Sequence, residues 1–267
     1  MRGKRKKQDV QQFQEHLMEN ILALHKTLKN KTYQHSNYYA FKISDPKPRD
    51  IHKATVQDRL VHHAIYRILY PYFDKKFIAD SYSCRENKGT HKAINRFRSF
   101  GYKVSKNNTK TCWILKCDIR KFFASIDHKI LMKILTKNIQ DHETLALLQK
   151  IIDSFPKGLP LGNLTSQLLV NIFMNEFDQF AKHILKAKCY IRYADDFVIL
   201  SENKEWLQSL IPKISDYLSE KLNLQLHPNK LYLRTWASGL DFLGWVNFPN
   251  HRVLRTSSKR RMIRNLQ

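Results

Sequence analysis

The sequence predicts an α+β fold. Apolar residues at the helical spacing of three or four alternate irregularly with short β-rich runs, without a regular strand–helix–strand repeat. The chain has 267 residues, 42% of them hydrophobic and 12% aromatic, which is enough for one large or two small cores. This composition disfavours a disordered or a fibrous protein.

The N-terminal third of the sequence contains helical patterns and one extended segment. Its first helix is predicted from a single amphipathic stripe, formed by Val10, Phe13, Leu17, Ile21, Leu24 and Leu28. Pro46 and Pro48 disfavour helix just before them, so we expect segment 38–50 to be extended or to turn. A further helix is predicted over Val56–Leu69, and the polar segment 101–111 is predicted to be an exposed loop.

The rest of the chain shows strands interspersed with helices. Trp113–Asp118 is predicted to be a buried strand that ends on a carboxylate. Cys189–Tyr193 and Phe197–Ser201 predict a tight hairpin with acidic residues at its tip. The other predicted elements are helices around Ile130–Leu135, Leu169–Ile184 and Trp206–Leu218, and short strands at Leu231–Leu233 and Leu240–Val246.

The charge of the chain indicates its class of partner. There are 47 Lys and Arg residues against 23 Asp and Glu, a formal charge of +24. Such a charge repels itself in a compact protein unless a polyanion neutralises it, which favours nucleic acid over an anionic membrane surface. No apolar run approaches the roughly 18 residues of a membrane span, and the basic N-terminus does not lead into a signal core. We therefore expect a cytoplasmic protein without a membrane partner.

Three carboxylates are predicted to meet. Asp195 and Asp196 lie at the tip of a hairpin between apolar strands, where two like charges resist burial, so a cation is expected beside them. Asp118 ends a second apolar strand. If these strands pair, the three side chains converge and provide the oxygen ligands with which two Mg²⁺ ions hold phosphates.

Four motifs in order resemble those of reverse transcriptases. They are Tyr193-Ala-Asp-Asp196, the preceding aspartate motif at 116–126, the loop at 158–167 and the segment Leu240-Asp-Phe-Leu-Gly-Trp245. The resemblance implies an RNA-directed DNA polymerase, a nucleotidyltransferase with a right-hand fold of fingers and palm.

The resemblance also implies a division of the chain and a reduced or missing thumb. The expected parts are a basic helical extension at 1–37, fingers at 38–111, a palm at 112–246, and a basic tail or thumb remnant at 247–267. Because only about 20 residues follow the last motif, either the thumb is reduced, a partner replaces it, or the sequence is truncated.

By position, the resemblance assigns the catalytic and metal-binding residues. Asp118, Asp195 and Asp196 are expected to bind two Mg²⁺ ions, which Mn²⁺ can replace. Phe123, five residues after Asp118, matches the bulky residue that excludes a ribose 2′-OH. Lys230, in a loop that carries a lysine near the leaving pyrophosphate, is a candidate proton donor.

The resemblance also assigns residues that bind the incoming dNTP. Arg49 matches an arginine that grips the triphosphate, a role that its fork of donors suits. Lys47 and Lys42 are both candidates for the accompanying lysine. Leu161 and Gln167 lie in the substrate-binding loop.

Three further residues are assigned to nucleic acid. Arg85 and Lys88 lie in a segment that resembles part of the fingers, and Trp245 ends the last motif. These assignments are expectations of contact with the template RNA or the RNA–cDNA hybrid.

The loop residues also suggest a subtype. Most relatives have Gln before Gly162 and Pro after Ser166, whereas this chain has Leu161 and Gln167. This form is similar to the reverse transcriptases of bacterial and phage diversity-generating retroelements, which copy adenines with errors and work with a small basic accessory protein. A leucine offers only apolar contact where an amide senses misalignment by hydrogen bonds. A phage-defence or retron-like reverse transcriptase, or a catalytically idle RNA-binding relative, remains an alternative.

Overall fold

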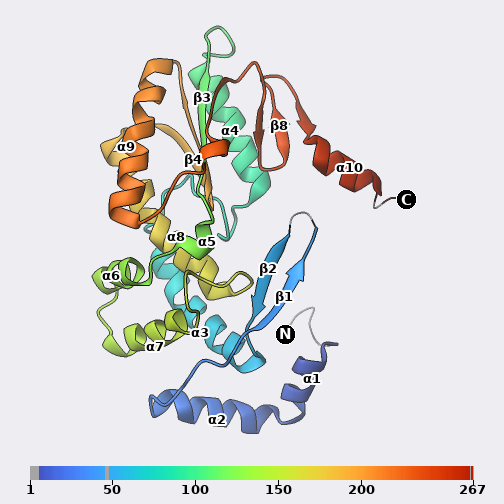
Figure 1. Cartoon of the computed structure of the whole chain (residues 1–267), viewed down its shortest axis with the longest axis vertical. Coiled ribbons are helices and arrows are strands. Elements are labelled where there is room, and N and C mark those ends of the chain that lie inside the picture. Colours follow the sequence, from blue (N-terminus) through green and yellow to red (C-terminus); the bar gives the residue numbers. More distant parts are fainter. Residues whose placement is uncertain (1–5, 46–47, 265, 267) are drawn as a thin grey trace. The chain divides into compact units, whose positions relative to one another are not determined.

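A computed structural model gives the fold and describes residues 6–45, 48–264 and 266 (Figure 1). Helices and strands are mixed along the chain, which confirms the predicted α+β class. The helices are α1 (Gln8–Glu15), α2 (Leu17–Lys29), α3 (Val56–Asp74), α4 (Thr90–Val104), α5 (Phe122–Ser125), α6 (His128–Asn138), α7 (His142–Asp153), α8 (Leu164–Gln179), α9 (Lys204–Leu222) and α10 (Thr256–Arg264). The strands are β1 (Tyr39–Ile43), β2 (Arg49–Lys53), β3 (Trp113–Asp118), β4 (Cys189–Tyr193), β5 (Asp196–Ser201), β6 (Tyr232–Thr235), β7 (Leu240–Phe242), β8 (Trp245–Asn247) and β9 (Arg252–Leu254).

The described residues form two compact units, each assembled from two stretches of chain. Unit 1 comprises residues within Met1–Lys75 and Phe123–Ile172, and unit 2 comprises residues within Lys76–Phe122 and Phe173–Gln267. The predicted division into extension, fingers, palm and tail stays a prediction.

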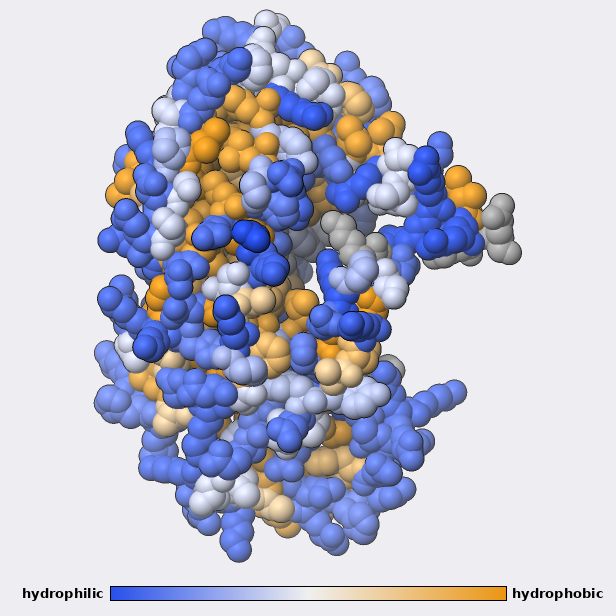
Figure 2. All heavy atoms as spheres, in the orientation of Figure 1, coloured by the Kyte–Doolittle hydropathy of each residue, from blue (hydrophilic) through white to orange (hydrophobic). Residues whose placement is uncertain are grey.

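One face of the molecule is mostly polar. Figure 2 shows that hydrophilic side chains cover most of the visible face, with apolar side chains between them. Within the described ranges, the chain contains no helix that combines the length and apolar character needed to cross a bilayer.

The predicted N-terminal helix is two helices. His16, with φ −115° and ψ 42°, lies outside the helical region and separates α1 from α2. Of the predicted apolar stripe, Val10 and Leu24 are buried, whereas Ile21 is 41% exposed. The prediction of one helix packed along one face was therefore wrong, because the break at His16 interrupts the stripe.

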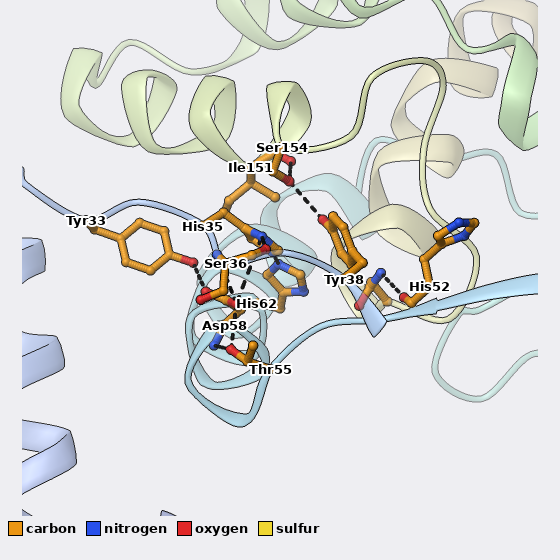
Figure 3. A network of polar contacts seen from close by, with 11 residues as sticks. Tyr33, His35, Ser36, Tyr38, His52, Thr55, Asp58, His62, Ile151 and Ser154 are labelled. Atoms are coloured by element: carbon orange, nitrogen blue, oxygen red, sulfur yellow. Dashed lines mark hydrogen bonds and ion pairs between the residues drawn. The ribbon is translucent and has the colours of Figure 1, made fainter. Parts of the chain in front are cut away.

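In unit 1, a buried carboxylate joins the segment before β1 to the start of α3 (Figure 3). Asp58 accepts hydrogen bonds from the hydroxyl of Tyr33 at 2.7 Å, from the backbone N–H of Ser36 at 3.2 Å and from Thr55 Oγ1 at 2.6 Å. Burial raises the pKa of Asp58, but these hydrogen bonds and His35 hold it below its usual value. Because Thr55 is also the N-cap of α3, the network fixes where this helix begins.

A histidine pair lies in the same network. The Nε2 atoms of His35 and His62 are 3.2 Å apart, and His62 is 1% exposed. Burial lowers the pKa of His62 to about 4; His35 and His63 lower it further, and Asp58 opposes them.

Unit 2 is built on a four-stranded antiparallel sheet in the order β4-β5-β3-β6. Helix α4 packs on this sheet through a cluster that includes Phe97, Phe100, Ile114 and Trp236. Residues 101–104 belong to this helix, so the loop predicted from 101 begins at Ser105. The helix continues because its last turn, although polar in sequence, packs against the core. A Cβ at Gly101 would lie 2.7 Å from the Trp236 ring.

The predicted single strand Leu240–Val246 is instead a hairpin of β7 and β8, which pairs with β9. Leu243 and Gly244 form its turn with positive φ values of 53° and 85°. A two-residue turn with two positive φ values matches strand twist, but leucine rarely adopts it. The sequence pattern therefore concealed the turn.

A fully buried ion pair joins α8 to the sheet. Arg192 donates to Asp178 from Nε and from Nη2, both at 2.7 Å, and neither side chain is exposed. Tyr190 donates to the same carboxylate at 2.6 Å. Since Arg192 Nη1 also donates to Ala194 O at 3.1 Å, the pair extends to the β4–β5 turn.

We predict that Arg192→Met lowers the free energy of unfolding by about 3–5 kcal/mol, because it leaves the Asp178 carboxylate buried without its cation. Urea unfolding measures this loss. Arg98→Met, at an exposed arginine of α4, is the matched control and should change stability by less than about 0.5 kcal/mol. A loss below about 1 kcal/mol in Arg192→Met would contradict a structural role for the pair.

We also predict that acid destabilises the protein through His62. The unfolded chain protonates this side chain near its ordinary pKa of 6.5, and the folded protein only near 4. Unfolding therefore takes up a proton between these values, and stability falls as the pH falls through them. From pH 7.5 to 5.0 His62 should contribute a loss of about 2 kcal/mol.

His62→Gln should remove this part of the pH dependence. His25→Gln, at an exposed position of α2, should retain it. Equal pH dependence in His62→Gln and in the unmodified protein would show that another group is responsible.

Candidate active site

The candidate site lies in unit 2, where β3 and β5 end. These strands pair antiparallel with Asp118 directly opposite Asp196. Asp196 also pairs with Tyr193 of β4, so Ala194 and Asp195 alone form the turn between β4 and β5. The predicted hairpin is present, with Asp196 as the first residue of its second strand. All three predicted carboxylate residues therefore lie at one end of the sheet.

The turn that carries Asp195 is held from both sides. Ala194 has a φ of 55°, a left-handed conformation that is unfavourable for a residue with a Cβ. Its carbonyl accepts a hydrogen bond from Arg192, and the carbonyl of Asp195 accepts one from the N–H of Ile119 at 3.2 Å. These contacts tie the turn to the end of β3 and support a conformation that the sequence does not favour.

Two lysines compensate the carboxylate charges. Lys116 Nζ lies 3.2 Å from Asp196 Oδ2, and Lys230 Nζ lies 2.9 Å from Asp118 Oδ1. Burial raises the pKa of Asp196 to about 7; Lys116 lowers it, while Asp118 and Asp195 raise it further. The site thus concentrates negative charge where solvent stabilises it poorly.

Lys230 reaches Asp118 because its loop is hydrogen-bonded to the end of β3. The N–H of His227 donates to Asp118 O at 2.8 Å, and the N–H of Arg120 donates to Gln225 O at 2.9 Å. His227 then caps the short 3₁₀ turn Pro228–Lys230. The predicted catalytic lysine is therefore brought to a predicted metal ligand.

The carboxylates suit a divalent cation. Asp196 Oδ1 is buried and accepts no hydrogen bond from any residue that the structure describes. Carboxylate oxygens are the ligands that Mg²⁺ prefers. Among the described residues, however, no group of three His, Cys, Asp or Glu side chains is arranged to hold a metal ion. Like charges avoid close approach unless a cation joins them, and two of these carboxylates pair with ammonium groups.

Unit 1 carries the residues predicted to bind the dNTP, and loop 158–163 connects them. Arg49 begins β2 and is exposed. The N–H of Leu159 donates to Phe123 O at 2.8 Å, and the N–H of His52 in β2 donates to Leu161 O at 3.0 Å. The loop therefore contacts both the predicted sugar-excluding residue and the strand of Arg49.

Gln167 is also connected to this loop, because its N–H donates to Asn163 O at 3.4 Å. Gln167 lies half-buried in α8, and Lys42 is exposed in β1 opposite Asp50. Lys47 lies outside the described residues.

Of the residues predicted to bind nucleic acid, two basic ones make internal contacts. Arg85 Nη1 donates to Ile78 O at 2.7 Å and to Ser81 O at 3.0 Å. Lys88 Nζ donates to Ala79 O at 2.7 Å. Trp245 begins β8 and is half-buried. Their contacts with nucleic acid stay predictions.

Sequence reasoning missed two basic residues of the site. Lys116 lies two residues before Asp118 on the same strand, and side chains two apart share a sheet face. That spacing is a signal for its position. Arg192 gave no comparable signal, because its partner Asp178 comes from a helix elsewhere in the sequence.

Comparison with known proteins identifies the family of the chain. Residues 41–246 match the family described as reverse transcriptase (RNA-dependent DNA polymerase). Protein YkfC of Escherichia coli is 26% identical over 258 residues, covering 81% of this chain and 66% of that protein. The group II intron-encoded protein LtrA of Lactococcus lactis is 23% identical over 303 residues, covering 85% of this chain and 49% of that protein.

Solved structures share the fold. Apo telomerase from Candida tropicalis superimposes with a TM-score of 0.65 at 12% identity, covering 84% of this chain and 49% of that one. Telomerase from the same organism, in complex with a fragment of telomeric RNA, has a TM-score of 0.66 at 13% identity, covering 91% and 49%. These neighbours support the right-hand polymerase fold.

The chain spans between about half and two thirds of the length of the curated relatives named above. Its match to the family nevertheless includes β3, the β4–β5 hairpin and the loop of Lys230. The chain belongs to the reverse transcriptase family.

Proposed function

We propose that this protein is an RNA-directed DNA polymerase that copies a template RNA into cDNA with two Mg²⁺ ions, which Mn²⁺ can replace. The observation that carries the proposal is the register of β3 and β5, which sets Asp118 across from Asp196 with Asp195 in the adjacent turn. Domains of this family generally use divalent metal ions.

The residues have separate tasks in this proposal. Asp118 and Asp195 would hold the ions, and Asp196 would complete the set. When bound, such ions hold phosphate oxygens and stabilise the charge of an in-line displacement at phosphorus. Lys230, already hydrogen-bonded to Asp118, would supply a proton to the leaving pyrophosphate.

Two residues of unit 1 would select the nucleotide. Arg49 would donate hydrogen bonds to its triphosphate, supported by the exposure of this side chain at the start of β2. Phe123 would exclude a ribose 2′-OH, supported by the hydrogen bond that fixes its backbone to loop 158–163.

The proposed partners follow from charge and resemblance. The formal charge of +24 supports binding of template RNA and of the RNA–cDNA hybrid. A small basic, oligomeric accessory protein belongs to the diversity-generating subtype. A cytoplasmic location in a bacterial or phage setting stays a prediction.

We propose the diversity-generating subtype on one feature, the presence of Leu161 and Gln167 where amide and proline are usual. Leu161 offers its carbonyl to His52, which leaves its apolar side chain as its contribution to fidelity. A phage-defence or retron-like enzyme would extend primers without errors concentrated at adenines. An idle RNA-binding relative would bind RNA and extend nothing.

Asp195→Ala should reduce extension of a primer on an RNA template by about a thousandfold or more, since a lost metal carboxylate raises the barrier by several kcal/mol. Asp216→Ala, at an exposed position of α9, is the control and should extend normally. RNA affinity should survive in both variants and fall steeply with salt. Undiminished primer extension by a folded Asp195→Ala protein would contradict the proposal.

Phe123→Ala should admit ribonucleotides, because the 2′-OH no longer meets an aromatic ring. The readout is the ratio of rNTP to dNTP incorporation under single-nucleotide conditions. Ile68→Ala removes an apolar side chain that is 74% exposed in the same unit, and it should leave the ratio unchanged. If both variants discriminate equally well, Phe123 has only a packing role.

Leu161→Gln should lower misincorporation opposite adenine by about two- to tenfold, the worth of one neutral hydrogen bond. Sequencing cDNA made from a defined RNA by both proteins measures the change. Accurate copying of adenines by the unmodified protein would refute the diversity-generating subtype and leave reverse transcription intact.

A further inference from the structure

Lys116 is a buried lysine with two partners in unit 2. Lysine is rarely buried unless its ammonium group is paired, and Lys116 is 8% exposed. Its Nζ lies 3.2 Å from Asp196 Oδ2 and donates to the backbone carbonyl of Asp241 at 2.6 Å. The ammonium group therefore connects a carboxylate of the candidate site to a backbone group 45 residues later in the chain.

These partners belong to different sheets. Asp196 begins β5 of the four-stranded sheet, whereas Asp241 is the middle residue of β7 in the three-stranded sheet β7-β8-β9. The carboxylate of Asp241 accepts a hydrogen bond from Arg255 Nη2 at 2.7 Å, immediately before α10 begins. Asp241 thus accepts a hydrogen bond from Lys116 on its backbone carbonyl and one from Arg255 on its carboxylate.

The β7–β8 hairpin depends on such contacts because its own geometry is unfavourable. Its turn holds Leu243 at a φ of 53°, and each of its strands has only three residues. A short hairpin is marginally stable without packing against other elements. Phe242 packs into the core of unit 2, and Lys116 adds a charged hydrogen bond beside it.

We propose that Lys116 is a positioning residue whose ammonium group fixes the β7–β8 hairpin to the Asp196 carboxylate. The conformational stability of the hairpin then depends on a carboxylate of the candidate site. The consequence for DNA synthesis rests on the function proposed above, whereas the link itself does not.

Hydrogen exchange on the metal-free chain of 267 residues tests the link. Lys116→Met keeps the length and the apolar stem of the side chain but removes all its donors. Exchange of the amides in residues 240–247 should quicken by about tenfold or more, as expected for the loss of a hydrogen bond to a charged group. Exchange in α9, on the same unit, should stay within about twofold of the unmodified protein.

Lys110→Met is the matched control. Lys110 has a side chain 53% exposed and lies 3.6 Å from Glu202. Its removal should leave exchange in 240–247 unchanged. Equal quickening in 240–247 and α9 on Lys116→Met would reveal general destabilisation, and unchanged exchange in 240–247 would mean that no link exists. Either result overturns the proposal.

Asp196→Ala tests the same link from its other end, and serves if Lys116→Met does not fold. The ammonium group then keeps the Asp241 carbonyl but loses the carboxylate that anchors it, so exchange in 240–247 should quicken selectively. Unchanged exchange would also overturn the proposal.

Kinetics separate positioning from binding. Lys116→Met should lower kcat by about tenfold while the Kd for primer–template changes by less than about threefold, and Lys116→Arg should restore part of kcat. A loss confined to primer–template affinity, or no rescue by arginine, would refute positioning. If the unmodified protein extends no primer, the proposed function fails, and the exchange experiment still decides whether the link exists.

Discussion

The site in unit 2 depends on the antiparallel register of β3 and β5, which places Asp118 opposite Asp196. That register brings like charges together at the end of an apolar sheet, where burial favours the neutral form of Asp196. Lys116 and Lys230 compensate the two carboxylates, and each comes from an element already fixed by its own hydrogen bonds. Arg192 in turn holds the strained Ala194, which lies between the paired strands.

Much of this could be predicted because the signals were local. The spacing of apolar residues around Cys189–Tyr193 predicts a hairpin, and the acidic tip of that hairpin matches the motif of reverse transcriptases. The α+β class follows from the mixture of helical spacings of apolar residues and short β-rich runs, and the structure confirms it. The position of Asp118 could be predicted because the apolar pattern of a buried strand ends on this charged residue.

What the sequence concealed depends on tertiary contact. In the sequence Arg192 has the pattern of an ordinary strand residue, and its role depends on the contact with Asp178 of α8. The turn at Leu243 contradicts local preference, and contacts made elsewhere support it, among them the packing of Phe242 and the hydrogen bond from Lys116 to Asp241 O. His16 breaks a stripe whose spacing continues unchanged across the break. Each of these features is a compromise between local preference and contacts made elsewhere.

In the proposed function, Asp118 and Asp195 hold the divalent ions of DNA synthesis. The most direct measurement is anomalous diffraction from crystals of the protein with Mn²⁺, a dideoxy-terminated primer on an RNA template, and the next dNTP. We predict Mn²⁺ peaks that contact both carboxylates and the nucleotide phosphates. A complete complex whose Mn²⁺ ions contact the phosphates without touching Asp118 or Asp195 would contradict this account.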